Sequence, residues 1–312
     1  MINLIRNFSN EEIIWTRDGK LSPLSPDTNK EHRADVAAIV VNRDRPDLVK
    51  ELLTQLEQMG HNLKIDVFII EMGSDPANLH GEYTYYYSDA EFRGKCFGHN
   101  VGLRIARATG QYRYYWILMN DIRFEPGVDA IQQLIDTADN NPDIAILSPT
   151  ERDSLYPASR PKDGNEYHTV STCDYLGFLM RSEAIDKVGF LNPVFKYSWG
   201  AIHELSYLLY CNGYRVAYSD IVTMKHLGGT TYGKTKNTIS RESYQKNAKL
   251  FCANYFVDRY GSNWDTEFTR VLPDDIEINT FRLHREFWEK ELKPGKHGSL
   301  VNYISRKIKS LF

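Results

Sequence analysis

An unbroken apolar run over residues 114–119 constrains the fold of this chain more than any other stretch. Such a run, without alternation of polar and apolar residues, is typical of a parallel strand that is covered on both faces. It stops at Asn120 and Asp121, and Pro126 and Gly127 end the extended segment. In open α/β sheets ligands bind beyond the carboxyl ends of strands, so Asp121 is a candidate for holding a metal ion or a ligand hydroxyl. An Asn-Asp turn without chemistry explains the same residues equally well.

Strands and amphipathic helices alternate through the first half of the chain. Four strands are predicted, over residues 36–41, 65–70, 114–119 and 144–147. The clearest helix starts near Pro46, and its apolar stripe consists of Leu48, Leu52, Leu53, Leu56 and Met59. The order β-α-β-α-β-α-β predicts an α/β fold, with a mostly parallel central sheet flanked by helices.

The second half of the chain contains shorter elements. The pattern predicts strands over 174–180 and 214–218 and helices over 183–188 and 203–213. We expect three parts: an N-terminal extension over residues 1–34, a main α/β domain over 35–239, and a C-terminal helical extension over 240–312. The basic amphipathic segment 300–312 favours contact with an anionic membrane face, with a partner, or with its own domain.

Composition excludes several classes of protein. The formal net charge of −3 argues against a general nucleic-acid binder, so no nucleic-acid partner is expected. The four cysteines are far apart and lack metal-finger spacing, which predicts free thiols in a reducing cytoplasm. No apolar run approaches the length of a membrane span, and we expect a cytoplasmic protein.

Several motifs, taken together, resemble inverting family-2 glycosyltransferases, most closely the rhamnosyltransferase-like and polysaccharide-assembly members. The similarity covers roughly residues 35–230, and its motifs are residues 36–46, the turn 69–75, residues 98–102, Asn120-Asp121, residues 179–190, His203-Glu204, residues 212–216 and His226. The resemblance implies a GT-A fold, a single α/β domain whose first half binds a nucleotide-sugar and whose second half binds the acceptor.

The resemblance also implies donor-binding roles for individual residues. Asn42 and Arg43 lie where the first strand meets the nucleotide. Glu71 takes the position of the acidic residue that accepts a hydrogen bond from a uracil or thymine imide, and Asp75 takes the second acidic position of that turn. Asn100 matches the residue near the diphosphate or ribose of the donor.

Further roles implied by the resemblance concern the metal ion and the chemistry. Asp121, preceded by Asn120 in the donor site, matches the last carboxylate of a DxD-type motif, and His226 completes the shell of a divalent cation, Mn²⁺ or Mg²⁺. Glu204 matches the general base. Lys234 follows His226 on a Gly-rich segment and is expected to close over the diphosphate.

The acceptor side and the departures from the family pattern complete the comparison. Tyr197 and Trp199 are expected to stack on acceptor sugar rings. The first slot of the DxD-type motif holds Met119, and the usual Glu-Asp pair is replaced by His203 and Glu204.

These residues predict direct displacement of a sugar from a UDP- or dTDP-linked donor to a hydroxyl of a glycan or glycolipid. One carboxylate base and no protein nucleophile give inversion at the anomeric carbon. An inactive relative that binds a nucleotide-sugar or glycan remains open because of Met119 and His203. Another nucleotide-binding enzyme, such as a nucleotidyltransferase, also remains open, although residues 42–46 lack the Gly-rich loop such enzymes use.

Purely structural interpretations stay open for single residues. Glu71 and Asp75 are ordinary turn formers, and His226 alone is typical of a structural histidine. Glu204 near the start of a helix is explained by the positive end of the helix dipole.

Overall fold

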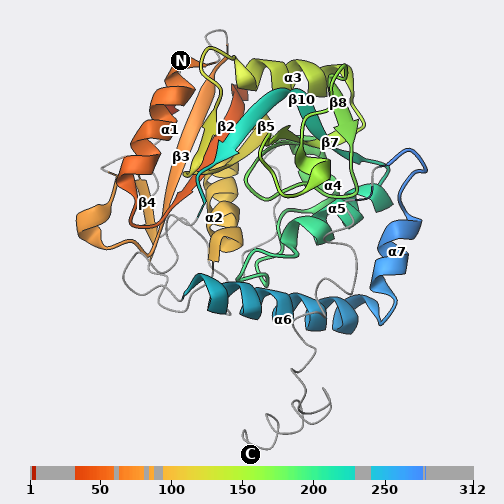
Figure 1. Cartoon of the computed structure of the whole chain (residues 1–312). Helices are drawn as coiled ribbons and strands as arrows, with labels where there is room; N and C mark the ends of the chain where they lie inside the picture. The colour runs from red at the N-terminus through yellow and green to blue at the C-terminus, as the bar shows by residue number, and fades with distance from the viewer. Residues whose placement is uncertain are drawn as a thin grey trace, which may run out of the picture.

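The central element of the molecule is one sheet with helices on both faces (Figure 1). The computed structural model describes residues 2–4, 32–59, 63–80, 84–87, 94–228, 240–276 and 278. The strands of this sheet are β1 (Ile2–Leu4), β2 (His32–Asn42), β3 (Ile65–Met72), β4 (Thr84–Tyr87), β5 (Gln111–Met119), β6 (Ile122–Phe124), β7 (Ile144–Thr150), β8 (Tyr167–Thr169), β9 (Gly177–Arg181) and β10 (Arg215–His226). The predicted α/β architecture is confirmed.

Strand order follows β1-β3-β2-β5-β9-β7-β10-β6, with β4 paired to β3 and β8 paired to β10. The first half is parallel, because β2 pairs in parallel with both β3 and β5. β9 is antiparallel to β5 and to β7, and β10 is parallel to β7. The carboxyl ends of β2, β3 and β5 therefore meet at one edge of the sheet.

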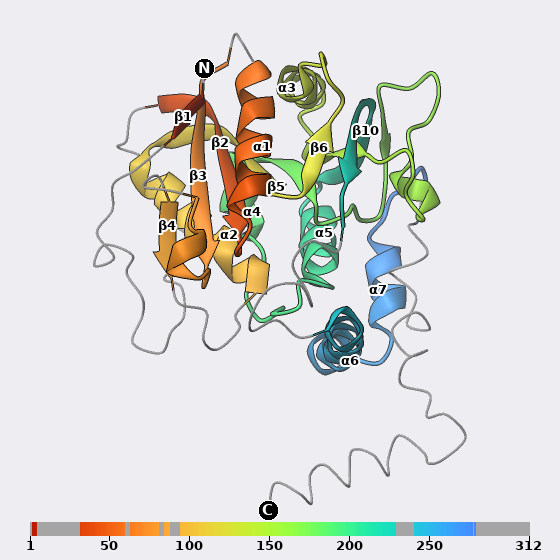
Figure 2. The ribbon, with the colours of Figure 1, turned by 60° about the vertical axis from the view of Figure 1, so that its left-hand side comes forward.

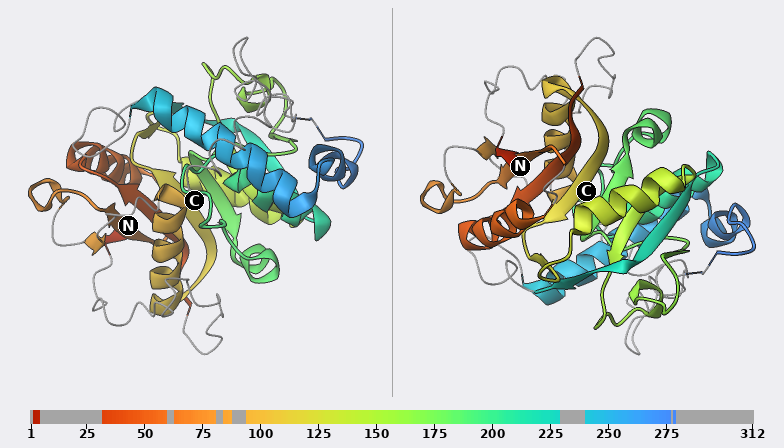
Figure 3. Two further views of the ribbon diagram at one scale, coloured as in Figure 1. Left: turned by 90° about the horizontal axis from the view of Figure 1, so that it is seen from below. Right: turned by 90° about the horizontal axis from the view of Figure 1, so that it is seen from above.

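Helices cover both faces of the sheet (Figures 1 and 2). Their bounds are α1 (Pro46–Gln58), α2 (Gly94–Thr109), α3 (Ala130–Asn140), α4 (Ser182–Val188), α5 (Ala201–Cys211), α6 (Arg241–Tyr260) and α7 (Trp264–Arg270). α1 and α3 pack on one face, and α2, α4 and α5 pack on the other. The view from below has α6 in front, running toward α7 (Figure 3).

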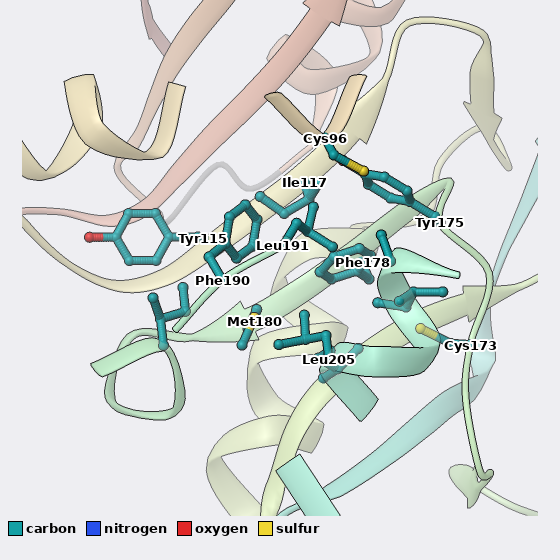
Figure 4. Close-up of a cluster of buried hydrophobic side chains, with 14 of the residues drawn as sticks. Cys96, Tyr115, Ile117, Cys173, Tyr175, Phe178, Met180, Phe190, Leu191 and Leu205 are labelled. Atoms are coloured by element: carbon teal, nitrogen blue, oxygen red, sulfur yellow. The ribbon is translucent and has the colours of Figure 1, made fainter. Parts of the chain in front are cut away.

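Alternate residues of β2 belong to two different cores. Val36, Ala38 and Val40 pack with α1 and α3, whereas Ala37 and Ile39 pack with the helices of the opposite face. The second core brings β5 and β9 together with side chains of α2 and α5 (Figure 4). Because both faces are buried, the strands of the first half carry the continuous apolar runs that the sequence displays.

Two glycines set the position of α2 on the sheet. A methyl group at Gly102 would lie 2.3 Å from Ile39 Cγ2, and one at Gly98 would lie 2.4 Å from Met72 Sδ. Any larger side chain would push the helix away from β2 and β3. These two glycines, which belong to the motif over residues 98–102, serve close helix packing here.

β10 differs most from the sequence-based prediction. We predicted a strand over residues 214–218, but β10 continues to His226 through an irregularity between Ser219 and Thr223. An irregularity of this kind lets a strand bend and change partners. Past it, β10 pairs with β6, and His226 lies opposite Ile122.

Helix ends differ from the prediction by a few residues. α5 begins at Ala201 rather than His203, because Gly200 adopts a left-handed φ of 86° immediately before it. All four cysteines are free thiols, as predicted. No helix in the described part of the chain has the length and apolar character needed to cross a membrane.

Candidate functional site

Polar side chains gather where β2, β3 and β5 end. In the sheet register Asn42 pairs with Glu71, and Val41 pairs with Met119, the residue that precedes Asn120 and Asp121. Ligands of open α/β sheets bind at this edge. The structure therefore brings together the strand-end residues that the sequence singled out.

A continuous chain of side-chain hydrogen bonds crosses these three strand ends. Asn120 Nδ2 donates to Asn42 Oδ1 at 2.6 Å, and Asn42 Nδ2 donates to both carboxylate oxygens of Glu71, at 3.0 and 2.9 Å. The Glu71 carboxylate also accepts from Ser74 Oγ at 2.7 Å and from the backbone N of His80 at 3.0 Å. Asn42 is 1% exposed and Glu71 0%. Neighbouring protein groups thus engage the polar atoms of both side chains, and their direct contact with a donor stays a prediction.

Loops after β2 and β3 are fastened to each other. Asp44 has a positive φ of 55°. Its backbone N donates to Ser74 Oγ at 2.9 Å, and its Oδ1 accepts from the backbone N of Asp75 at 2.7 Å. The exposed Asp75 caps the short 3₁₀ helix Pro76–Asn78 by accepting from Ala77 N. Arg43 lies half-buried in the same loop.

Arg45 is a cation near the site that the sequence analysis did not single out. Its guanidinium donates to Asp47, and this hydrogen bond is the main reason why the pKa of Arg45 is raised. The charge of Asp121 raises that pKa further. Arg45 and Asp121 are therefore within electrostatic range of each other. The signal in the sequence was the arginine one residue before Pro46.

Pairing of β6 with β10 brings Asp121 and His226 together. His226 Nε2 lies 3.4 Å from Asp121 Oδ2, and the backbone N of Leu227 donates to the carbonyl oxygen of Asp121 at 2.9 Å. Asp121 is 5% exposed. Glu151, another residue that the sequence analysis missed, accepts from the backbone N of His226 at 3.2 Å. Only the continuation of β10 creates this arrangement.

This pair of side chains fits a hard divalent cation in its donor atoms. A carboxylate oxygen and an imidazole nitrogen suit Mn²⁺ or Mg²⁺, and Mg²⁺ commonly uses one or two protein carboxylates and completes its shell with water and substrate phosphates. Within the described ranges no group of three or more His, Cys, Asp or Glu side chains is arranged to hold a metal ion. A cation held here would complete its shell with water molecules or with oxygens of a bound diphosphate.

Glu204 lies in the first turn of α5 and contacts α6. Its Oε1 accepts from Tyr255 OH at 2.6 Å and from Tyr260 OH at 2.7 Å, and its Oε2 accepts from Asn192 Nδ2 at 2.8 Å. Burial, followed by the bond to Glu204, raises the pKa of both tyrosine hydroxyls, which therefore stay protonated as donors. Glu204 is 5% exposed. Its carboxylate is held in place from three directions.

Helix α6 also holds the predicted acceptor residues. Tyr244 OH donates to the carbonyl oxygen of Tyr197 at 2.5 Å, and Cys252 Sγ donates to the carbonyl oxygen of Trp199 at 2.8 Å. The rings of Tyr197 and Tyr244 pack edge to face at 5.5 Å. Both Tyr197 and Trp199 are half-buried. The helix thus fixes the loop on which these rings lie.

Asn100 forms its hydrogen bonds away from the strand-end group. Asn100 donates from Nδ2 to the carbonyl oxygens of Cys96 and Leu191, both at 2.7 Å, and so ties α2 to the loop before α5. Its contact with a donor stays a prediction. Lys234 lies outside the described residues, as does the basic segment 300–312.

Comparison with known proteins identifies the fold. No protein-family model matches the sequence, and no curated protein matches it. Among solved structures, the chain is similar to the mannosyltransferase PcManGT from Pyrobaculum calidifontis in complex with GDP-Man and Mn²⁺, with a TM-score of 0.50 and 14% identity over 92% of this chain and 84% of that one.

Two other solved structures give the same result. TarS residues 1–349 from S. aureus has a TM-score of 0.51 and 11% identity over 84% of this chain and 76% of that one. GalNAc-T7 with UDP, GalNAc and Mn²⁺ has a TM-score of 0.53 and 12% identity over 91% of this chain, which spans 58% of that one. At these identities the likeness is one of fold, and the fold is GT-A.

Proposed function

We propose that this protein is an inverting glycosyltransferase, which moves a sugar from a nucleoside-diphosphate sugar to a hydroxyl of a glycan or glycolipid. The observation that carries the proposal is the meeting of Asp121 and His226, 3.4 Å apart, beside the polar strand ends of a GT-A sheet. Solved structures of this fold hold GDP-Man, UDP-GlcNAc or UDP. For this chain we propose a UDP- or dTDP-linked donor, and a protein of the rhamnosyltransferase-like, polysaccharide-assembly type.

On the donor side we propose that Asp121 and His226 hold Mn²⁺ or Mg²⁺ against the diphosphate. The cation would neutralise the negative charge that develops on the leaving phosphate. In this proposal the donor site also comprises Asn42, Arg43, Glu71, Asp75, Asn100 and Asn120. Lys234, from the segment after His226, would contact the diphosphate.

On the acceptor side we propose Glu204 as the general base, with Tyr197 and Trp199 beside the acceptor sugar. An acceptor hydroxyl needs a carboxylate to take its proton during attack. The hydroxyls of Tyr255 and Tyr260 both donate to Oε1 of Glu204 and so orient the carboxylate. Oε2 accepts only from Asn192 Nδ2 among these donors, and we propose Oε2 as the oxygen that takes the proton.

A second function is favoured by two observations. Glu204 is 5% exposed and already accepts three hydrogen bonds, and Met119 occupies the first slot of the metal motif. Both features suit a relative that binds a nucleotide-sugar without transferring the sugar.

Binding and turnover distinguish the two functions. A thermal-shift screen of nucleotide-sugars, with and without Mn²⁺, identifies the donor, because a ligand that binds only the folded state raises the melting temperature. Hydrolysis of that donor is then measured. A Mn²⁺-dependent shift with turnover supports the transferase, and a shift without turnover supports the binding protein. No shift with any nucleotide-sugar would contradict both.

We also propose that the C-terminal basic segment makes peripheral contact with an anionic membrane at the cytoplasmic side. Its sequence combines an apolar stripe with Arg306, Lys307 and Lys309. Liposome flotation of the chain with and without residues 298–312 tests this, and equal flotation of both forms would remove the idea.

A further inference from the structure

The buried chain of hydrogen bonds connects two parts of the site that the sheet keeps on separate strands. One end is Asn120, the residue directly before Asp121. The other end is Ser74, in the turn that follows β3. Asn42 and Glu71 lie between them and are both buried.

Each member of this chain depends on its neighbours. Asn42 is an amide whose oxygen accepts from Asn120 while its nitrogen donates to Glu71, so it can serve both only in one orientation. Glu71 receives its remaining donors, Ser74 Oγ and His80 N, from the turn itself. A buried polar group that loses its hydrogen-bond partner bears the full cost of its desolvation. A change in the orientation of one of these side chains is therefore expected to change the orientation of its neighbours as well.

The turn end of the chain is also the end that would meet the nucleotide. Ser74 Oγ accepts a hydrogen bond from the backbone N of Asp44 at 2.9 Å. Asp44 Oδ1 accepts one from the backbone N of the exposed Asp75. The orientation of Glu71 thus fixes two loops at once. At the opposite end of this hydrogen-bonded series, Asn120 is followed directly in the sequence by Asp121.

We propose that Asn42 is a positioning residue that couples the Asp121–His226 cation site to the nucleoside-binding turn over residues 73–80. This inference rests on the proposed function. A ligand bound at either site orders the hydrogen-bonded side chains at that end. The second ligand then binds to side chains that are already ordered, which raises its affinity. The coupling passes through the protein and does not need direct contact between the cation and a diphosphate.

A nucleoside without phosphates isolates this coupling, because the cation has no diphosphate to bind. Mn²⁺ affinity is measured by the electron paramagnetic resonance signal of free Mn²⁺, with and without saturating uridine, and with thymidine and guanosine in parallel. In the parental chain we expect the nucleoside to tighten Mn²⁺ binding by about 5-fold or more, the lower end of common coupling strengths. In Asn42→Leu the ratio of the Mn²⁺ affinities with and without nucleoside should fall to about 1.

Asn141→Leu is the matched control. Asn141 is the same residue type, ends α3, and binds Tyr167 OH and the carbonyl oxygen of Thr137 at the opposite end of the parallel strands. It should retain the parental coupling. If Asn42→Leu fails to fold, Ser74→Ala takes its place and should reduce the coupling. It removes one of the two hydrogen bonds from the turn to Glu71, keeps the one from His80 N, and leaves Asn42 and Asn120 bonded.

The outcomes separate the two proposals. A parental chain that binds Mn²⁺ and a nucleoside independently of each other would overturn the coupling alone. Unchanged coupling in Asn42→Leu or Ser74→Ala, or its loss in Asn141→Leu, would also overturn it. A parental chain that binds neither ligand would contradict the proposed function as well.

Discussion

The donor side and the acceptor side of the site are held in different ways. On the donor side Asn42, Glu71 and Asn120 are bonded to one another at the ends of adjacent parallel strands. On the acceptor side Glu204 is held by Tyr255 and Tyr260, which lie 51 and 56 residues further along the chain. The donor side is therefore a property of the sheet, and the acceptor side depends on how α6 docks.

Packing around the two sides differs in the same way. α2 approaches β2 and β3 closely through Gly98 and Gly102. α6 and α7 dock instead through aromatic rings, among them Phe195 on Tyr255 at 4.7 Å and Phe256 on Trp264 at 4.6 Å. We expect changes in α6 to alter the acceptor side and to leave nucleotide binding intact.

The largest expected effect is that of Glu204→Gln on sugar transfer. Removing the proton acceptor should lower the rate by about 10²–10⁴-fold, while the donor Kd stays near the parental value. The new amide would face Asn192 Nδ2, so the melting temperature is measured alongside. If the folded variant has the parental rate, the general base is another residue, with Asp174 and His203 the next candidates. If the variant loses donor binding, the donor side and the acceptor side are not independent.

Asp121→Ala should act on the opposite side. We expect Mn²⁺-dependent nucleotide binding to weaken by at least about 100-fold, since even indirect partners of a metal ligand commonly contribute 10- to 100-fold. Isothermal titration calorimetry with Mn²⁺ and with EDTA measures this. Equal affinities under both conditions in the parental chain would contradict a metal role for Asp121.

A pH-dependent effect is expected where the two halves meet, at His99. Burial lowers the pKa of His99 on α2 to about 3. In the unfolded chain the His99 imidazole binds a proton below about pH 6.5, whereas in the folded chain it stays neutral down to about pH 3. The free energy of unfolding therefore falls as the pH drops from about 6.5 toward about 3. Between pH 7 and pH 5 this amounts to about 2 kcal/mol of unfolding free energy.

Urea denaturation at both pH values measures the His99 effect, with His99→Gln as the comparison. His99 packs on Tyr175, beside β9, and its Nε2 lies 3.3 Å from the carbonyl oxygen of Leu118 on β5. The variant removes the titrating group, so its loss of stability between pH 7 and pH 5 should be smaller by that amount. An identical pH slope in both proteins would contradict the assignment.

The smallest effect is expected for Tyr255→Phe. It removes the hydrogen bond to the Glu204 carboxylate and the one that Tyr255 OH accepts from Asn192 Nδ2, and should lower the free energy of unfolding by at least about 1.5 kcal/mol. Tyr167→Phe, which loses a neutral bond to Asn141 on the other side of the sheet, is the control and should cost less. A change in donor Kd in Tyr255→Phe would show that the two sides are not independent.

The sequence predicted those features of the fold that depend on residues close to one another in the chain. Strands β2, β3 and β5 and helix α1 follow from periodicity and apolar runs, which express backbone geometry within a few residues. The position of Asp121 at a strand end followed from the same reasoning. The closeness of Asp121 and His226 was implied only by the family resemblance, because it needs β10 to continue past an irregularity that no local pattern marks.

The sequence by itself determined the α/β sheet and the edge at which its polar residues collect, because the periods of strands and helices are local. Only the tertiary structure decided which partners those residues have. Glu71 belongs to a sequence that suits a turn with an exposed acid, yet it lies in β3, where it is buried and hydrogen-bonded to Asn42 and Ser74. Glu204 looks like a favourable charge at a helix start, yet its hydrogen bonds come from α6. Such contacts join residues far apart in the chain, and only packing brings them together.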